Sequence, residues 1–203
     1  MQPIISINGE PEKFDDIFTS CKPKQLTKMI YNVSERNANI EELTMAEAVL
    51  DDGQRMFGLN DIFVGKMNQI SAYYTLSQGK FSEAQSSSGI VVSTGTGSTA
   101  WMDAIIAGAY GIVNPGNQKK VDESFDRDSD YFRYFVREPF KTKTTSCNRI
   151  TGYIDKNNPL NIISNMAEDG VIFSDGIITD YIIFNAGANV IIRPAETKVQ
   201  LVR

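Results

Sequence analysis

The stretch "SSSGIVVSTGTGSTAW" (residues 86–101) carries the strongest local signal in the chain. The apolar run Ile90–Val92 enters a segment of Ser, Thr and Gly, and an Ala-rich apolar run from Trp101 to Tyr110 follows it. A strand, a turn of small residues and a helix, in this order, form many phosphate and nucleotide sites, because the free N–H groups at a helix N-terminus attract anions. The stretch therefore predicts a nucleotide site.

Two other interpretations fit the same residues. Residues 95–100 match the dinucleotide fingerprint G-x-G-x-x-A. A Rossmann unit, however, also needs a second strand and an acidic residue about 20 positions further on. Here the helix runs into Asn-Pro-Gly at residues 114–116 and a charged loop, without a clear second strand. Alternatively, the loop only caps the helix, with Ser98 or Thr99 as the N-cap.

Composition and charge exclude several classes of function. The 203 residues allow one large domain or two small ones, and a hydrophobic content of 41% is enough for a core. The net charge of −5 argues against a general attraction to nucleic acid or to a membrane surface. The sequence has no histidine, which excludes Ser-His pairs, Cys-His pairs and His-based metal sites.

The two cysteines and the short apolar runs indicate the cellular compartment of the protein. Cys21 and Cys147 lie far apart, and no signal-peptide pattern precedes them. We therefore predict two free thiols in a reducing, cytoplasmic environment. The uninterrupted apolar runs are only a few residues long, so no membrane-spanning segment is predicted.

The first part of the chain predicts one strand and one helix. "PIISIN" (3–8) is expected to form a strand. Residues 23–37 are expected to form a helix, with Leu26, Ile30 and Val33 at helical spacing.

The rest of the chain predicts a mainly β fold with few helices, an α+β class. Residues 40–65 suggest two strands around an Asp-Asp-Gly turn, and residues 70–84 repeat the pattern around Gly79. A helix is expected from about residue 99 to 110, followed by a surface loop or weak helix over 114–130. Short β-like runs fill residues 131–203, which favours a sandwich over alternating βα units.

Four segments, in order, resemble the NAD kinase family. "STGTGSTAW" (93–101) is similar to the family signature T-P-T-G-S-T-A-Y. "GLNDIFVG" (58–65) is similar to the motif A-L-N-E-[IV] and lies upstream at the usual distance. "INGEPEKFDD" (7–16) resembles the segment N-x-D-P-x-x-S-x-G, and "EDGVIFSDGIITDYIIF" (168–184) resembles the late D-G segment.

Several details resemble the mitochondrial-type branch of this family most closely. Gly95 replaces the usual Pro, Trp101 replaces Tyr, Ser-Ser-Ser-Gly precedes the signature, and "VREP" occupies residues 136–139. The resemblance implies the β-sandwich-like C-terminal lobe of the NAD kinase and diacylglycerol kinase-like fold.

The family resemblance also implies an activity and its ligands. NAD kinases transfer a phosphoryl group from ATP, or in some members from polyphosphate, to the adenosine 2′-hydroxyl of NAD, which gives NADP. The implied partners are NAD or NADP, ATP or polyphosphate, Mg²⁺ with ATP, and a second copy in a homodimer, with neither nucleic acid nor membrane. Two alternatives stay open: a sugar or lipid kinase of the same superfamily, and a non-catalytic β-rich binding or assembly module.

The chain lacks the family's G-G-D-G-T motif, whose Asp is the proposed general base. Asp52-Gly53, Asp169-Gly170 and Asp175-Gly176 each lack the preceding glycine pair. We therefore expect residues 1–203 to form a single NAD-binding C-terminal lobe, with an α/β lobe upstream. Neither a catalytic residue nor a metal ligand is assigned to this chain, which is expected to be inactive alone. The other interpretation is a short protein that has lost its catalytic lobe.

The motif matches assign adenosine-binding residues one by one. Asn60 matches the motif Asn, whose amide can both donate to and accept from the adenosine. Asp61 replaces the usual Glu and can accept a ribose hydroxyl, but it reaches one methylene less. Thr99 and Ala100 match residues that flank the adenine, and Trp101 offers a stacking face.

Two further positions depart from the family, and five residues shape the loop. Ala104 lies where many members have Ser. Ser88 lies where the common branch has an Asp that holds the nicotinamide side, and a neutral Ser cannot pair with the cationic ring. The loop-shaping residues are expected to be Thr94, Gly95, Thr96, Gly97 and Ser98.

Overall fold

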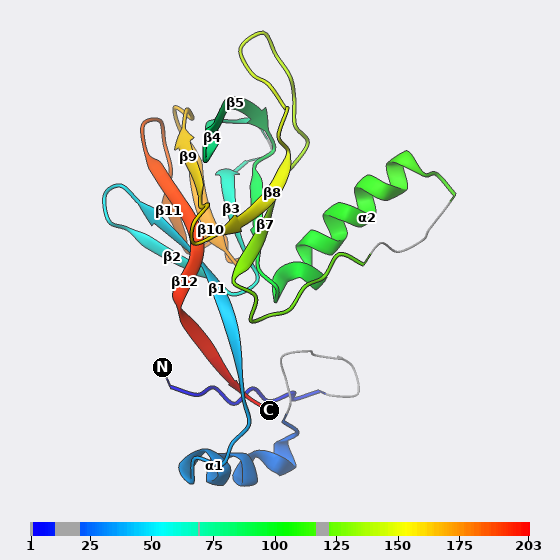
Figure 1. Cartoon of the computed structure of the whole chain (residues 1–203), viewed down its shortest axis with the longest axis vertical. Helices are drawn as coiled ribbons and strands as arrows, with labels where there is room; N and C mark the ends of the chain where they lie inside the picture. The colour runs from blue at the N-terminus through cyan, green and yellow to red at the C-terminus, as the bar shows by residue number, and fades with distance from the viewer. Residues whose placement is uncertain (1, 11–20, 69, 117–121) are drawn as a thin grey trace. The chain divides into compact units, whose positions relative to one another are not determined.

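The computed structural model describes residues 2–10, 21–68, 70–116 and 122–203 (Figure 1). Residues 11–16 of the segment "INGEPEKFDD" lie outside this range. The chain divides into two compact units: Met1–Leu43 with Glu196–Arg203, and Thr44–Ala195. The division falls within β1 and β12, two long strands.

Two six-stranded antiparallel sheets make up most of the structure, as the β-rich sequence predicts. The first sheet has the strand order β2-β1-β12-β9-β4-β5, and the second has the order β11-β10-β3-β6-β7-β8. The strands of the first sheet are β1 (Ile40–Leu50), β2 (Arg55–Gly58), β4 (Ala72–Gln78), β5 (Phe81–Ser87), β9 (Leu160–Ser164) and β12 (Asn189–Val202). Those of the second are β3 (Asp61–Lys66), β6 (Ile90–Ser93), β7 (Tyr131–Val136), β8 (Thr151–Asp155), β10 (Gly170–Ser174) and β11 (Tyr181–Ile183).

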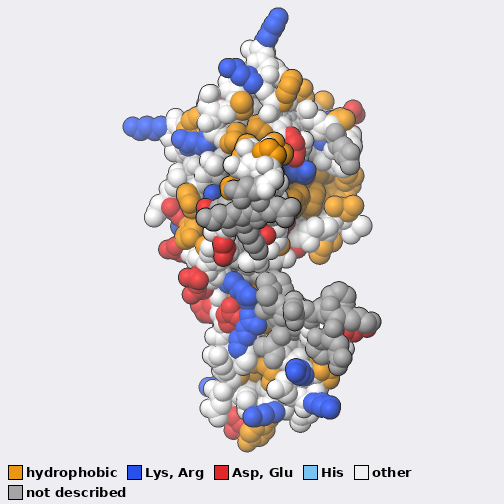
Figure 2. All heavy atoms as spheres, turned by 90° about the vertical axis from the view of Figure 1, so that its right-hand side faces the viewer, with side chains coloured by type: hydrophobic (Ala, Val, Ile, Leu, Met, Phe, Trp, Pro, Cys, Tyr) orange, Lys and Arg blue, Asp and Glu red, His pale blue; other side chains and the backbone are white. Residues whose placement is uncertain are grey.

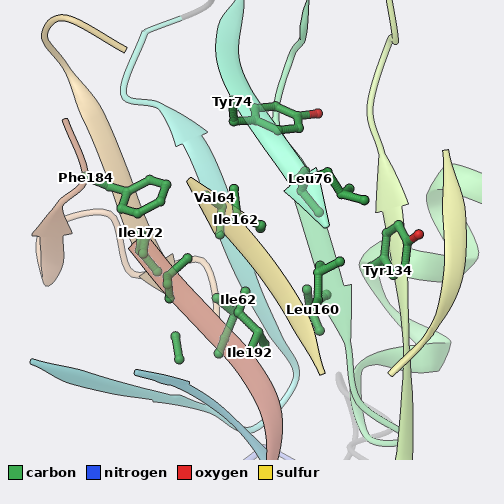
Figure 3. Packing of buried hydrophobic residues seen from close by; sticks show 14 of the residues in the cluster. Ile62, Val64, Tyr74, Leu76, Tyr134, Leu160, Ile162, Ile172, Phe184 and Ile192 are labelled. Atoms are coloured by element: carbon green, nitrogen blue, oxygen red, sulfur yellow. The ribbon is translucent and has the colours of Figure 1, made fainter. Parts of the chain in front are cut away.

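The two sheets share one hydrophobic core, which confirms the sandwich-like class. Alternate residues of a strand point to opposite faces, so one face of each sheet is buried. Tyr74 and Leu76 of β4 belong to the same buried cluster as Ile62 and Val64 of β3 (Figure 3). Burial of each such side chain contributes about 1.5–3 kcal/mol, so this cluster holds the sheets together.

The opposite face of the second sheet carries a separate apolar cluster. The strand register places Phe173 beside Phe63, and Phe63 beside Val91. Helix α2 (Trp101–Val113) contributes Trp101 and Ile105 to this cluster. The candidate site lies on this side of the sheet, because β3, β6 and α2 all carry residues of segments that resemble family motifs.

Helix α2 begins two residues later and ends three residues later than expected, and residues 97–99 form a short 3-10 helix, η2 (Gly97–Thr99). The C-terminal end of α2 is exposed to solvent, since Ile112 is 82% and Val113 is 74% exposed. Hydrophobic side chains are visible at the surface on this side of the larger unit (Figure 2). No helix in the described ranges is long and apolar enough to cross a membrane.

The smaller unit contains η1 (Pro23–Gln25) and α1 (Leu26–Ser34), which confirms the helix expected after Pro23. The inward face differs from the expected one. Met29 is buried together with Leu26 and Val33, whereas Ile30 is 53% exposed. Positions i, i+3 and i+7 of this helix therefore face the small core, and Ile30 lies outside that stripe.

The strand expected over residues 3–8 is wrong. Two isolated parallel bridges take its place, one between Ile4 and Leu201 and one between Ile7 and Cys21. A bridge joins single residues, so this segment does not form a continuous ladder. Both cysteines are free thiols, as expected.

The observed strand pairing confirms some of the other expected strands and corrects others. Residues 40–65 form three strands instead of two, because the chain leaves the ladder at Leu59 and Asn60 between β2 and β3. The hairpin around Gly79 is confirmed. Of the two alternatives for residues 114–130, the described residues 114–116 and 122–130 form a loop and not a helix. The last two β runs form one continuous strand, β12.

Candidate functional site

The connection between β2 and β3 lies against the loop that follows β6. Asp61, the first residue of β3, pairs with Ser93, the last residue of β6. The Thr94 amide donates to the Asn60 carbonyl at 3.0 Å, and Thr94 Oγ1 donates to the Leu59 carbonyl at 2.5 Å. The two segments that resemble family motifs are thus joined through their backbones.

Gly95 and Gly97 are required by close backbone contacts. A Cβ atom on Gly97 would lie 1.9 Å from the Asn60 carbonyl oxygen, and one on Gly95 would lie 1.9 Å from the Asp126 carbonyl oxygen. Ser98 Oγ donates to the Gly95 carbonyl at 2.7 Å. The loop of residues 94–98 is therefore packed between the Asn60 backbone and residues 125–126.

Two buried polar atoms, one beside this loop and one within it, have no hydrogen-bond partner among the described residues. Asp61 is 5% exposed and Thr96 is 1% exposed, and both Asp61 Oδ1 and Thr96 Oγ1 are unpaired among the described residues. Buried polar groups are normally paired, and leaving one unpaired costs about 1–3 kcal/mol. A hydroxyl or amino group of a ligand can supply the missing donor.

The Asn60 side chain is available for the same purpose. The hydrogen bonds that Asn60 makes to Thr94 and Asp175 use its backbone carbonyl and amide. The side-chain amide is half-buried and can present a donor and an acceptor to one base edge.

The environment of Asp61 also changes its acidity. Burial and, to a smaller extent, the negative charge of Asp175 together raise the pKa of the Asp61 carboxyl to about 6. At pH 7.5 the carboxyl is mostly ionised and accepts hydrogen bonds, whereas below pH 6 it is mostly protonated.

Asp175 is a site residue that sequence reasoning missed. Its carboxylate accepts the backbone N–H groups of Asn60 at 2.7 Å, Leu59 at 3.0 Å and Asp61 at 3.2 Å. Both Asp175 and Gly176 have positive φ, 53° and 72°, as the two central residues of a type I′ turn require, and the Ile177 amide donates to the Ser174 carbonyl at 2.9 Å. The Asp-Gly pair was a usable turn signal, but the sequence gives no indication of which backbone the carboxylate contacts.

The start of α2 differs from the expected capping arrangement. Neither Ser98 nor Thr99 is its N-cap; Ala100 takes that position, without a side-chain hydrogen bond. The Ser98 hydroxyl is used within the loop and accepts the Phe125 amide at 3.3 Å. Thr99, Ala100 and Ala104 are exposed.

Trp101 belongs to an aromatic cluster that the sequence analysis did not predict. Its ring stacks on Phe63 with a centroid distance of 5.8 Å, and Phe63 stacks on Phe173 at 4.7 Å. The Arg137 guanidinium lies over the Trp101 ring, 5.5 Å from its centroid. Trp101 is half-buried, so it both packs on the sheet and keeps part of its surface open.

Ser88 lies away from Asn60, Asp61 and the loop of residues 94–98. It is exposed in the turn between β5 and β6, at the opposite end of β6 from Thr94. Six residues of extended chain span roughly 20 Å. Arg137 binds this turn, since the Ser88 amide donates to the Arg137 carbonyl at 2.9 Å. The structure therefore gathers Asn60, Asp61 and residues 94–98 at one end and leaves Ser88 at the other.

Neither a protein-family model nor a curated protein sequence matches the chain. Among solved structures, the chain is similar to one described as "Crystal Structure of Yeast NADH Kinase complexed with NADH", with a TM-score of 0.65 and 15% sequence identity. The match covers 92% of this chain and 51% of the kinase chain. The chain thus has the NAD kinase-like fold and spans about half the length of that kinase. The resemblance to the mitochondrial-type branch stays a prediction.

Proposed function

We propose that this chain is the NAD-binding lobe of an NAD kinase, which phosphorylates the adenosine 2′-hydroxyl of NAD to give NADP. The observation that carries the proposal is the pair of unpaired buried atoms, Asp61 Oδ1 and Thr96 Oγ1, where two family-like segments meet. The NAD kinase-like fold supports it.

The residues suit a substrate adenosine better than a cofactor diphosphate. A Rossmann site needs an acidic residue after the helix to bind the ribose 2′-hydroxyl, the group that this reaction must leave free. Here the buried acid, Asp61, lies upstream on β3. Gly97 packs on the Asn60 backbone, so its lack of a side chain already has a structural cause other than approach of a diphosphate.

The phosphoryl donor is assigned to a part of the enzyme outside this chain. Transfer requires in-line positioning, neutralisation of phosphate charge and a base near the hydroxyl. The described residues contain no group of three or more His, Cys, Asp or Glu side chains that could hold a metal ion. Mg²⁺–ATP or polyphosphate, a cytoplasmic location and a homodimer belong to the proposal for the complete enzyme.

Calorimetric titration of the 203-residue chain with NAD, NADH and NADP tests the binding part. Asn60→Ala should weaken binding by about tenfold to a hundredfold, because a base edge loses its partner. Asn157→Ala, in an exposed loop, is the matched control and should change nothing. A chain that binds none of the three dinucleotides would favour the sugar or lipid kinase, and one that binds no nucleotide would favour the assembly module.

A second assay tests whether catalysis requires the lobe that carries G-G-D-G-T in addition to this chain. The chain alone, given NAD with ATP or polyphosphate, should form no NADP, whereas a protein that adds a G-G-D-G-T lobe should form it. Turnover by the chain alone would show that the base lies within it, and Asp169 and Asp175 would be the first residues to substitute.

A further inference from the structure

The turn between β10 and β11 acts on the candidate site through one side chain. Asp175 uses both carboxylate oxygens on the backbone of the β2–β3 connection: Oδ1 accepts from Asn60 and Asp61, and Oδ2 accepts from Leu59. Hydrogen bonds to an ionised acceptor are stronger than those between neutral groups. Three consecutive amides are therefore held by one anion.

This arrangement fixes the backbone from which the Asp61 side chain projects. The Asp61 amide donates to Asp175 Oδ1, and the Asp61 carbonyl accepts the Asp175 amide at 3.1 Å. On its other side Asp61 pairs with Ser93. With the backbone held from both neighbouring strands, the buried Asp61 Oδ1 remains without a partner.

We propose that Asp175 is a positioning residue for ribose recognition: it holds the Leu59–Asp61 backbone so that the buried Asp61 Oδ1 has no donor from the protein and is left to accept a hydroxyl of the nucleotide. The proposal rests on the proposed function and deepens it, because it assigns ribose discrimination to an Asp61–Asp175 pair. The nearby charge of Asp175 also makes the Asp61 carboxylate more basic, and a more basic oxygen is a better hydroxyl acceptor.

The opposite end of β10 offers a matched control. Asp169 also precedes a glycine and also has a positive φ, 59°. Its carboxylate, however, accepts from the exposed side chain of Asn68 at 3.3 Å. The two Asp-Gly pairs thus share strand, sequence and backbone conformation, but only Asp175 binds the Asn60–Asp61 segment.

The test compares AMP with 2′,3′-dideoxy-AMP by calorimetry on the full chain. The wild-type chain should bind AMP about tenfold or more tightly than the dideoxy ligand, the value expected for one hydrogen bond to a carboxylate. In Asp175→Asn, one carboxylate oxygen becomes an NH₂ group that faces a backbone donor. The AMP preference should fall to within about threefold, with dideoxy affinity retained, while Asp169→Asn should keep the full preference.

The outcomes separate the two proposals. A folded Asp175→Asn chain that keeps the wild-type preference overturns the positioning role, and so does a wild-type chain that binds both ligands equally. A wild-type chain that binds neither NAD nor AMP overturns the proposed function itself.

A measurement on the wild-type chain covers the case in which Asp175→Asn does not fold. In NMR spectra, AMP, but not the dideoxy ligand, should shift the carboxyl carbon of Asp61. Equal shifts with both ligands would contradict the proposal.

Discussion

The loop of residues 94–98 and helix α2 follow one another and are both rich in small residues, yet their environments are opposite. Every residue of the loop is buried. In α2 only Met102 is buried, and the far end of the helix is open. Small residues in the loop allow backbones to touch, whereas those in the helix leave a surface uncovered. Glycine content alone therefore does not locate the site; the contacts around each glycine do.

Replacing one glycine from each region gives the largest expected difference in stability. Gly97→Ala places a Cβ 1.9 Å from the Asn60 carbonyl oxygen and should destabilise the chain by about 3 kcal/mol, as overpacking against backbone does. Gly108→Ala, in α2, meets nothing within 4 Å and should stabilise it by about 0.5–1 kcal/mol. Urea unfolding measures both. Equal effects of the two substitutions on stability would contradict the statement that the loop is tightly packed and the helix is exposed.

The buried acid beside the loop should make stability depend on pH. Its pKa in the folded chain is about 6, above the ordinary 3.8, so the folded chain holds this proton more tightly than the unfolded chain does. The stabilisation of the folded chain by the Asp61 proton is complete below pH 3.8 and is lost as the pH rises through 6. Asp61→Asn should therefore raise the free energy of unfolding by about 2 kcal/mol at pH 7.5 and very little at pH 4.

The exposed Asp180→Asn serves as the control for this pH series and should have no effect at either pH. If Asp61→Asn changes the free energy of unfolding equally at pH 4 and pH 7.5, the ionised carboxylate is not the cause of the change.

Trp101 tests the contact between the start of α2 and the sheet. If its ring stacks on the adenine, as the proposed function has it, Trp101→Ala should weaken the binding of NAD and NADP together by about 1–3 kcal/mol. Ile105→Ala removes an aliphatic neighbour from the same cluster and should lower the melting temperature without that loss of affinity. Should both variants bind like wild type while folded, Trp101 acts only as a core residue.

The smallest effect is expected on the open side of the helix. Ala104 is exposed, so Ala104→Ser should change both stability and dinucleotide affinity by less than about 0.5 kcal/mol. Calorimetry would reveal a larger gain in affinity, which would mean that the ligand reaches further along α2 than the loop contacts indicate.

Much of the fold could be predicted because it follows from local pattern. The alternation in β4, with Ala72, Tyr74 and Leu76 buried, follows directly from a period of two. The break at Leu59 and Asn60 has a local turn signal in Asn60-Asp61, but the tertiary hydrogen bonds to Asp175 that end the ladder there could not be predicted from local pattern.

The candidate site was only partly predictable for the same reason. Asn60, Asp61 and residues 94–98 are found through contiguous motifs. Asp175 reaches them from 114 residues further along the chain, and the stack of Trp101 on Phe63 depends on how α2 docks on β3. Such long-range contacts leave no trace in local periodicity.

The most direct measurement of the central claim is a titration of the 203-residue chain with AMP and, separately, with nicotinamide mononucleotide. If the loop of residues 94–98 and the Asn60–Asp61 segment bind the adenosine half of NAD, AMP binds and competes with NAD, Asn60→Ala weakens AMP by about tenfold or more, and nicotinamide mononucleotide does not bind. Binding of nicotinamide mononucleotide in place of AMP, or AMP binding that Asn60→Ala leaves unchanged, would contradict the account.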